Sequence, residues 1–233
     1  MIINGHNITV HLDNTVILKD ISFSLKPGHL TVFLGKSGSG KTTLLRCLAG
    51  LQRFSSGRLI KEKEKRIGFV SQNLDLFPHM SVLKNCMHPQ LCILKRKKVE
   101  AERISKKFLE KLELIDYQHK MPCQLSGGQK QRLAIARILS MDVDAILFDE
   151  PTSALDPYST ENFRLLLESL KEKGLTLVVS THDMNFVRSS LDRVYLIYDG
   201  VILDFYEKVS GKEMNFNSPL YEYIWSNLDS KNN

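Results

Sequence analysis

The fold is decided by residues 30–51, which read LTVFLGKSGSGKTTLLRCLAGL. Leu30–Leu34 is a near-continuous apolar run, typical of a strand that is buried on both faces of a mostly parallel sheet. A glycine-rich loop follows, and Thr42–Leu51 then holds good helix formers with no breaker before Gly50. Strand, glycine loop and helix in this order predict the opening of a nucleotide-binding α/β unit.

The glycine-rich loop matches the pattern G-x-x-x-x-G-K-[ST], which reads GKSGSGKT over residues 35–42. Glycines allow backbone N–H groups to curl around phosphate oxygens, Lys41 can reach the β- and γ-phosphates, and the Thr42 hydroxyl can ligate Mg²⁺. The N-terminus of the following helix adds its positive dipole to the same cradle. The residues predicted to bind the nucleotide here are Gly35, Ser37, Gly38, Ser39, Gly40, Lys41, Thr42 and Thr43.

Further buried strands follow along the chain. Ala145–Phe148, Leu175–Ser180 and Val194–Tyr198 are apolar runs of strand length. Helical stretches separate them, including Glu161–Lys171 before a glycine. This alternation predicts a wound, mostly parallel sheet around the glycine loop.

Two carboxylates come directly after the run that ends at Phe148. Asp149 lies at the carboxyl end of a predicted buried strand, where an aspartate can hold the Mg²⁺ shell. Glu150 points elsewhere and can polarise an attacking water as general base. Acidic pairs also occur at ordinary solvated strand ends, so this prediction depends on the glycine loop being present in the same chain.

The two ends of the chain differ from this core. The opening segment alternates in the manner of strands at Ile8–Leu12, Val16–Leu18 and Ile21–Leu25. The tail, about 212–233, is polar with scattered aromatic residues. We expect the tail to form a short docking helix with a frayed end.

The middle of the chain, about 77–140, is predicted to be a helical insertion. From Lys95 to about Ile115 the pattern is that of an amphipathic helix. The apolar face of this predicted helix comprises Ile104, Phe108, Leu112 and Ile115.

Composition excludes several classes of protein. Of the 233 residues, 42% are apolar and 25% are charged, which is ordinary globular usage and excludes wholesale disorder. No apolar run approaches the ~20 residues that a membrane span needs, and no signal peptide is expected at the N-terminus. The four cysteines are scattered, with no C-x-x-C pair, so no zinc or disulfide framework is expected. The net charge of +6 is compatible with nucleic acid, an anionic membrane surface, phosphate ligands or solubility alone.

A second anion site is predicted where another helix begins. Ser126, followed by Gly127 and Gly128, presents a hydroxyl and exposed N–H groups just before the helical pattern Leu133–Leu139. The same residues would also suit a plain helix N-cap with a flexible entry. One nucleotide rarely needs two phosphate cradles from one chain.

Together these residues resemble the nucleotide-binding subunit of an ABC transporter. Leu125–Gln129 is similar to the signature sequence that separates this family from other P-loop ATPases. In the family's order, Gln72 matches the Q-loop glutamine, Ser153–Asp156 the D-loop, and His182 the switch histidine. The resemblance covers nearly the whole chain and implies a single domain, residues 1–233. Its expected fold is an α/β P-loop NTPase core, a mostly parallel sheet flanked by helices, with a small antiparallel β-subdomain and a helical insertion.

The resemblance also implies a role for each matched residue. Gln72 would touch Mg²⁺ or the attacking water and sense a membrane partner. His182 would contact the γ-phosphate and help position the catalytic Glu150. The implied cofactors are ATP and Mg²⁺, and the implied metal ligands are Thr42, Gln72 and Asp149. A homodimer would sandwich two ATP molecules, each also reached by the other copy's signature residues Ser126, Gly127, Gly128 and Gln129.

Finer features are similar to the ATPases of polar amino-acid importers. These features are residues 76–85, LFPHMSVLKN, and residues 149–157, DEPTSALDP. The resemblance implies transmembrane permease subunits, an extracytoplasmic solute-binding protein and a peripheral position at the cytoplasmic face of the inner membrane, with no nucleic acid. Other cargoes, such as lipoprotein release or methionine uptake, stay open, as does a soluble ABC ATPase acting on ribosomes or DNA. A small-molecule kinase would have no use for Leu125–Gln129.

Three stretches either depart from the family pattern or are not explained by it. His11-Leu12 stands where the family usually has an aromatic residue that stacks on adenine. Between Gly50 and Gln72 the chain is shorter than usual, and Lys61–Arg66 there is expected to be a solvated hairpin or loop. The run Lys95–Lys98 is either a solvated stretch or a contact with anionic lipid headgroups.

Overall fold

The apolar runs around the glycine loop come together in one six-stranded sheet. The computed structural model describes residues 3–62, 65–209 and 213–225. In spatial order the strands of this sheet are β5 (Ile67–Val70), β6 (Ala145–Asp149), β7 (Thr176–Thr181), β3 (Leu30–Leu34), β8 (Arg193–Tyr198) and β9 (Val201–Glu207). Neighbouring strands are parallel except that β9 runs antiparallel to β8. Every residue of β3, β6 and β7 is buried, which confirms that these strands are covered on both faces.

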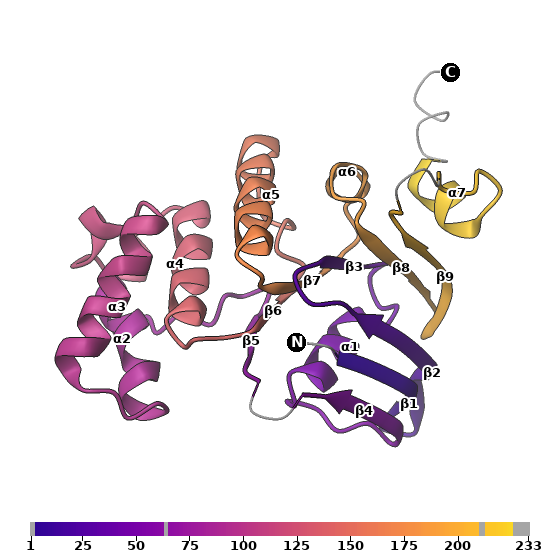
Figure 1. Cartoon of the computed structure of the whole chain (residues 1–233), viewed down its shortest axis with the longest axis horizontal. Helices are drawn as coiled ribbons and strands as arrows, with labels where there is room; N and C mark the ends of the chain where they lie inside the picture. Colours follow the sequence, from indigo (N-terminus) through magenta and orange to yellow (C-terminus); the bar gives the residue numbers. More distant parts are fainter. Residues whose placement is uncertain (1–2, 63–64, 210–212, 226–233) are drawn as a thin grey trace.

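Side chains alternate between the two faces of the sheet and build a separate core on each. The helices involved are α1 (Lys41–Leu48), α5 (Pro157–Glu172), α6 (Met184–Ser189) and α7 (Pro219–Trp225). Val32 and Leu34 of β3 belong to the core on the side of α5, α6 and α7, whereas Phe33 belongs to the core shared with α1 and the N-terminal strands. Figure 1 shows α5 and α6 on one side of the sheet and α1 on the other.

α1 is shorter than the sequence predicts. The predicted helix runs to Leu51, whereas α1 ends at Leu48, with Ala49 as its C-cap. Gly50 has a φ of 73°, the left-handed conformation that commonly terminates a helix. Gly50 thus follows directly on the C-cap, and its left-handed backbone terminates the helix two residues after Leu48.

A small antiparallel sheet packs against the α1 face of the main sheet. Its strands, in spatial order, are β2 (Thr15–Leu25), β1 (Ile3–Leu12) and β4 (Ser56–Lys61). The sequence predicts two strands where β2 is continuous, because Asp20 adopts a φ of 55° and the pairing with β1 absorbs the polar break through register shifts. Of the predicted loop Lys61–Arg66, Lys61 lies in β4, and residues 63–64 lie outside the described residues.

Three helices lie beyond β5, on the opposite side of Figure 1 from the antiparallel sheet. They are α2 (Val82–Cys92), α3 (Lys98–Lys111) and α4 (Gly127–Leu139), with two short 3₁₀ turns, η1 (Ile115–Tyr117) and η2 (Pro122–Gln124), between α3 and α4. The predicted single helix from Lys95 to about Ile115 is too long, because Lys95 has a left-handed φ of 55° and the helix ends with Leu112 as C-cap. α2, which contains Pro89, lies within the predicted helical insertion, although no individual helix is predicted at these residues.

α3 buries part of the predicted apolar face, since Leu112 is buried and Phe108 and Ile115 pack against the core, but it also buries a stripe that the apolar pattern does not predict. Ala101, Ser105 and Leu109 are buried, whereas Ile104 is half-buried. The buried amide of Gln90 on α2 donates to Ser105 Oγ at 2.8 Å. The two helices thus meet through small residues and a satisfied polar contact, which an apolar periodicity cannot reveal.

The C-terminal segment packs on the main sheet. Leu220 and Ile224 of α7 are buried, and the rings of Tyr221 and Trp225 stack with centroids 5.2 Å apart. α7 therefore matches the expected docking helix in the tail, whose last residues, 226–233, lie outside the described residues. Among the described residues, no helix has the length and apolar character needed to cross a membrane.

The four cysteines are expected to divide into two reactive and two protected thiols. Burial raises the pKa of the Cys47 thiol to about 11 and that of Cys86 to about 12, whereas Cys92 and Cys123 are exposed. We expect a thiol-reactive chromophore at pH 8 to modify Cys92 and Cys123 in the folded protein, and all four thiols once guanidinium has unfolded the chain. Rapid reaction of a third thiol in the folded protein would contradict the burial of Cys47 and Cys86.

Candidate functional site

The glycine-rich loop joins the end of β3 to the start of α1. Gly40, the N-cap of α1, has a φ of 100°, and a Cβ there would lie 2.6 Å from Leu18 Cδ2. Ser39 is buried, and within the described part of the chain its hydroxyl has no hydrogen-bond partner. A buried hydroxyl without a partner, in a loop of glycines at a helix N-terminus, fits a loop that closes around phosphate oxygens.

Lys41 is almost completely buried, with 4% of its side chain exposed. Its ammonium donates to the carbonyl oxygens of Gly35 at 2.7 Å and Lys36 at 2.9 Å, and lies 3.2 Å from Glu150 Oε1. A buried ammonium needs such partners, because an unpaired charge is costly to remove from water. These contacts hold the lysine inside the loop where the sequence predicts the phosphates.

A set of oxygen donors lies where β6 and β7 end beside α1. Thr42 Oγ1 donates to Asp149 Oδ1 at 2.9 Å, and Ser180 Oγ donates to the same carboxylate oxygen at 2.7 Å. Mg²⁺ prefers oxygen ligands and is often held by one or two carboxylates together with water and phosphate. Thr42 and Asp149 therefore fit Mg²⁺, and the sequence misses Ser180, which fixes the orientation of the aspartate.

Glu150 follows Asp149 in a backbone conformation that is unfavourable for most residues. Its φ is 47°, in the left-handed region, and such strain is often found at active sites. Its backbone N–H donates to the Ser180 carbonyl at 3.1 Å. Its carboxylate, 13% exposed, lies between Lys41 and His182, whose Nδ1 is 2.8 Å from Glu150 Oε2. The turn after β6 thus aims this carboxylate across the mouth of the glycine loop.

Gln72 approaches the same place from the end of β5. Its Nε2 donates to Ser153 Oγ at 3.4 Å, and that hydroxyl donates to the Glu150 carbonyl at 2.9 Å. One pocket of about 220 Å³ gathers most of the predicted site, and its lining comprises Ile17, Ser37, Gly38, Gly40, Lys41, Thr42, Thr43, Gln72, Glu150 and His182. Gly35 and Asp149 contact this lining through Lys41 and Thr42.

The second predicted anion site lies outside this pocket. Ser126 is the N-cap of α4, and its Oγ accepts the Gln129 N–H at 3.3 Å while Gln129 Oε1 accepts the Ser126 N–H at 2.9 Å. A Cβ on Gly127 or Gly128 would meet open space. Within one chain, the structure does not bring Ser126, Gly127, Gly128 and Gln129 to the glycine loop.

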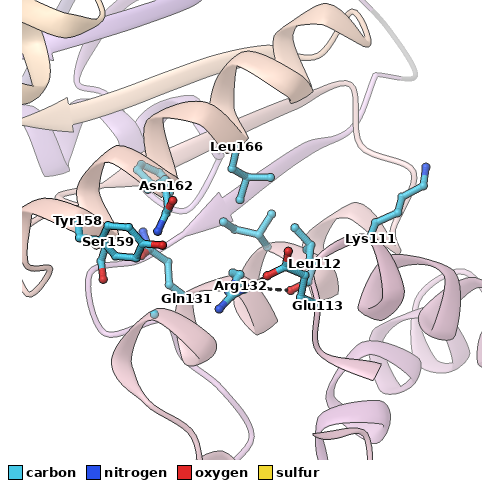
Figure 2. A pocket seen from close by; sticks show the side chains of 12 residues that line it. Lys111, Leu112, Glu113, Gln131, Arg132, Tyr158, Ser159, Asn162 and Leu166 are labelled. Carbon is cyan, nitrogen blue, oxygen red and sulfur yellow. Dashed lines mark hydrogen bonds and ion pairs between the residues drawn. The ribbon is translucent and has the colours of Figure 1, made fainter. Parts of the chain in front are cut away.

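A larger cleft of about 410 Å³ separates α4 from α5 (Figure 2). Gln131 and Arg132 of α4 face Tyr158 and Asn162 of α5 across it, and Arg132 pairs with Glu113 at 2.6 Å. The sequence does not predict this cleft, because its walls come from separate segments of the chain. The chemistry is placed in the smaller pocket, where the lysine, the two carboxylates and the imidazole converge.

One buried residue of α4, Arg137, holds the segment that follows Gln72. Its guanidinium donates to the Leu74 carbonyl at 2.8 Å and to the Asp75 carbonyl, and lies 5.5 Å from the centroid of the Phe77 ring. Leu74 and Asp75 have φ values of 63° and 42°, so two successive residues are left-handed. Burial lowers the pKa of the Arg137 guanidinium, but arginine stays charged in proteins. The sequence gives no signal for this contact.

Replacing Arg137 with methionine is expected to lower the free energy of unfolding by about 1–3 kcal/mol, because two carbonyl groups lose their donor in a buried place. Urea unfolding measures this change. Arg137→Lys should recover part of it, since one ammonium can still donate to a carbonyl. Arg103→Met, at an exposed position of α3, is the matched control and should have little effect. Equal stability of Arg137→Met and Arg103→Met would exclude this contact as a support of the segment.

The two residues in the place of the usual adenine-stacking aromatic are not among those that line the pocket. His11 is exposed, and its backbone N–H donates to Ser55 Oγ at 3.0 Å. The residue of the antiparallel sheet that lines the pocket is Ile17. The structure therefore offers an aliphatic side chain, rather than the imidazole, beside the glycine loop.

Comparisons with known proteins identify relatives of this chain. Residues 18–153 match the model of the family described as ABC transporter, and residues 122–188 match a model described as AAA domain, putative AbiEii toxin, Type IV TA system. The glutamine transport ATP-binding protein GlnQ of Geobacillus stearothermophilus is 39% identical, over 85% of this chain and 88% of its own. The arginine transport ATP-binding protein ArtM of Bacillus subtilis is 40% identical, over 81% of this chain and 84% of its own. The dimeric structure of the ABC transporter cassette MJ0796 superposes with a TM-score of 0.76 and 32% identity, over 88% of this chain and 98% of that one.

Proposed function

The chain belongs to the ABC transporter family as an ATP-hydrolysing subunit, and from this premise we propose that it energises import of polar amino acids through separate permease subunits. The observation that carries the ATPase assignment is the convergence of Lys41, Glu150 and His182 on one pocket at the glycine loop. The cargo assignment is supported by the relatives above, which are named for glutamine and arginine transport.

In this proposal Glu150 accepts the proton of the attacking water. A general base must lie within hydrogen-bond reach of that water, and the contacts with Lys41 and His182 hold the carboxylate at the mouth of the loop. Lys41 and the loop N–H groups neutralise phosphate charge, which is the main requirement of phosphoryl transfer. Mg²⁺, when bound, would be held by Thr42, Asp149 and Gln72 and would supply further neutralisation of the phosphate oxygens.

A second copy of the chain is proposed to complete each site. The N-terminus of α4, with Ser126–Gln129, lies outside the pocket of its own chain and offers the N–H groups that suit a phosphate. A twofold dimer would place each α4 N-terminus against the nucleotide of the partner and so form two equivalent sites. The dimeric state of the related cassette MJ0796 supports this arrangement.

The remaining partners follow from the transport assignment. We infer transmembrane permease subunits that contact the chain, and an extracytoplasmic solute-binding protein that delivers the cargo. The subunit would then lie at the cytoplasmic face of the inner membrane. Support comes from relatives named as transport ATP-binding proteins, and no nucleic acid takes part in this scheme.

The proposal is tested by purifying the tagged chain from detergent-solubilised membranes together with the membrane proteins that accompany it. The complex is reconstituted in proteoliposomes together with the solute-binding protein of the system. Uptake of labelled glutamine, glutamate, arginine and methionine is compared between vesicles that have ATP on the side of the ATPase subunit and vesicles without ATP. We expect ATP-dependent uptake of at least one polar amino acid, and none with Glu150→Gln. Uptake of methionine alone would overturn the cargo assignment, and copurification of ribosomes or DNA without membrane proteins would overturn the transport assignment.

A further inference from the structure

The basic run at residues 95–98 is not uniformly solvated, because one of its residues turns inward. The side chain of Arg96 is 14% exposed and donates to Gln90 Oε1 at 2.9 Å and to the Ser140 carbonyl at 2.8 Å, and it pairs with Asp142. Its backbone N–H donates to the Gln90 carbonyl at 3.2 Å. The loop between α2 and α3 is therefore fixed to α2 and to the end of α4.

The neighbours of Arg96 are turned outward. Lys95, Lys97 and Lys98 are exposed, and the flanking Ile93 and Val99 are 70% and 81% exposed. We call residues 93–99 the basic tip; they include four basic residues and no acidic one. A fixed loop thus presents lysines together with aliphatic side chains that have no cover within the described structure.

Local helix stability does not account for these lysines. Lys97 is the N-cap of α3 and Lys98 is its first residue. The N-terminus of a helix carries partial positive charge, so cations there are disfavoured. The first turn holds one acidic residue, Glu100, to offset them. The sequence therefore places cations at the end of α3 where they weaken it.

The charge of the whole chain is concentrated in the same region. Residues 77–140 carry 13 Lys and Arg against 5 Asp and Glu, a net charge of +8, whereas the rest of the chain carries 19 against 21, a net charge of −2. Nucleotide binding does not explain this distribution, because the glycine loop lies outside residues 77–140 and the proposed second anion site, Ser126–Gln129, contains no charged residue. The helices that hold the charge are those farthest from the antiparallel sheet (Figure 1).

We propose that the basic tip is a contact surface for the anionic phospholipid headgroups of the membrane against which the subunit works. Lys95, Lys97 and Lys98 bind lipid phosphates, and Ile93 and Val99 enter the boundary between headgroups and acyl chains. Basic residues interleaved with bare aliphatic ones suit such a boundary. Nucleic acid is a poorer match, since the tip has no aromatic residue on which a base could stack. The inference rests on the proposed place of the subunit at a membrane.

The experiment is cosedimentation of the purified full-length chain with vesicles of phosphatidylglycerol and phosphatidylcholine, and with phosphatidylcholine alone, without nucleotide. Each surface lysine contributes about fivefold to binding an anionic membrane, so the triple variant Lys95→Gln, Lys97→Gln, Lys98→Gln should bind on the order of a hundredfold more weakly. Ile93→Ser with Val99→Ser should weaken binding severalfold and leave its salt dependence unchanged. The matched control is Lys19→Gln, Arg58→Gln, Lys61→Gln, which removes the same charge from the antiparallel sheet and should bind like the parent chain.

Circular dichroism and nucleotide binding verify that each variant is folded. Equal binding by the Lys95, Lys97, Lys98 variant and the parent chain would overturn the proposal, as would an equal loss in the control, which would mean that net charge alone acts. Equal binding to phosphatidylcholine alone would also overturn it. If the vesicle test fails while the reconstituted complex still transports, the lipid contact is wrong and the proposed function stands.

Discussion

Replacing Glu150 with glutamine is expected to lower steady-state ATP hydrolysis by about 10²–10⁴-fold, because the amide cannot accept a proton from the attacking water. Nucleotide binding should be unchanged or slightly tighter. The carboxylate lies 3.2 Å from the Lys41 ammonium, so its loss leaves more of the positive charge of the lysine for phosphate. We therefore expect the hydrolysis rate to fall while the affinity for nucleotide either stays the same or rises slightly.

The measurement is phosphate release at saturating ATP, together with the affinity for a fluorescent ATP analogue. Glu172→Gln, at an exposed carboxylate in the last turn of α5, is the control and should hydrolyse ATP like the parent chain. Turnover of Glu150→Gln within a few-fold of the parent chain would exclude Glu150 as the general base.

Replacing Lys41 with methionine is expected to lower hydrolysis by at least about 10²-fold, as the loss of one charge-stabilising donor does in other active sites. Affinity for ATP should also fall, by about tenfold or more, since hydrogen bonds to charged groups contribute about 1.5–3 kcal/mol. The change also removes the donor that holds the carbonyl oxygens of Gly35 and Lys36, so the loop loses part of its own support.

Lys36→Met is the control for this second variant, because Lys36 lies in the same loop but is exposed. It should retain most of the activity of the parent chain. Lys41→Met combined with Glu150→Gln should lose much less than the two single losses multiplied, since residues in contact act as a unit. Parent-like affinity of Lys41→Met for ATP would contradict its assignment to the phosphates, and strictly multiplicative losses would contradict the contact between the two residues.

The strands that are buried on both faces are the parts of the fold that the sequence predicts best. The runs that became β3, β6 and β7 are apolar throughout, because both faces of each strand are covered. It fails for β4, which is mostly exposed and carries no apolar alternation, and for the half-buried edge strand β9. The prediction for α3 is incomplete in a third way, since the apolar pattern misses the buried stripe of Ala101, Ser105 and Leu109, which includes a polar contact with Gln90.

The site divides in the same way. Residues whose chemistry depends on near neighbours, such as Lys41 in its glycine loop, are predicted because spacing along the chain determines their geometry. Arg137 and Ser180 are missed as parts of the site, since their contacts join segments far apart in the chain, and nothing local marks an arginine that will face two carbonyl groups 62 and 63 residues earlier. Pocket size is also a poor guide, as the larger cleft lies between α4 and α5.

Through the contact of Arg137, α4 connects two functional segments, one near each of its ends. Its N-terminus, at Ser126, is proposed to serve the nucleotide of the partner chain, while Arg137 near its C-terminus grips the segment just after Gln72, which serves the nucleotide of its own chain. A permease that pulls on this segment would then move groups at both nucleotides of the dimer in one stroke. The two hydrolysis sites would thus be coupled, because a movement of the segment after Gln72 in one chain would change the geometry at both nucleotides.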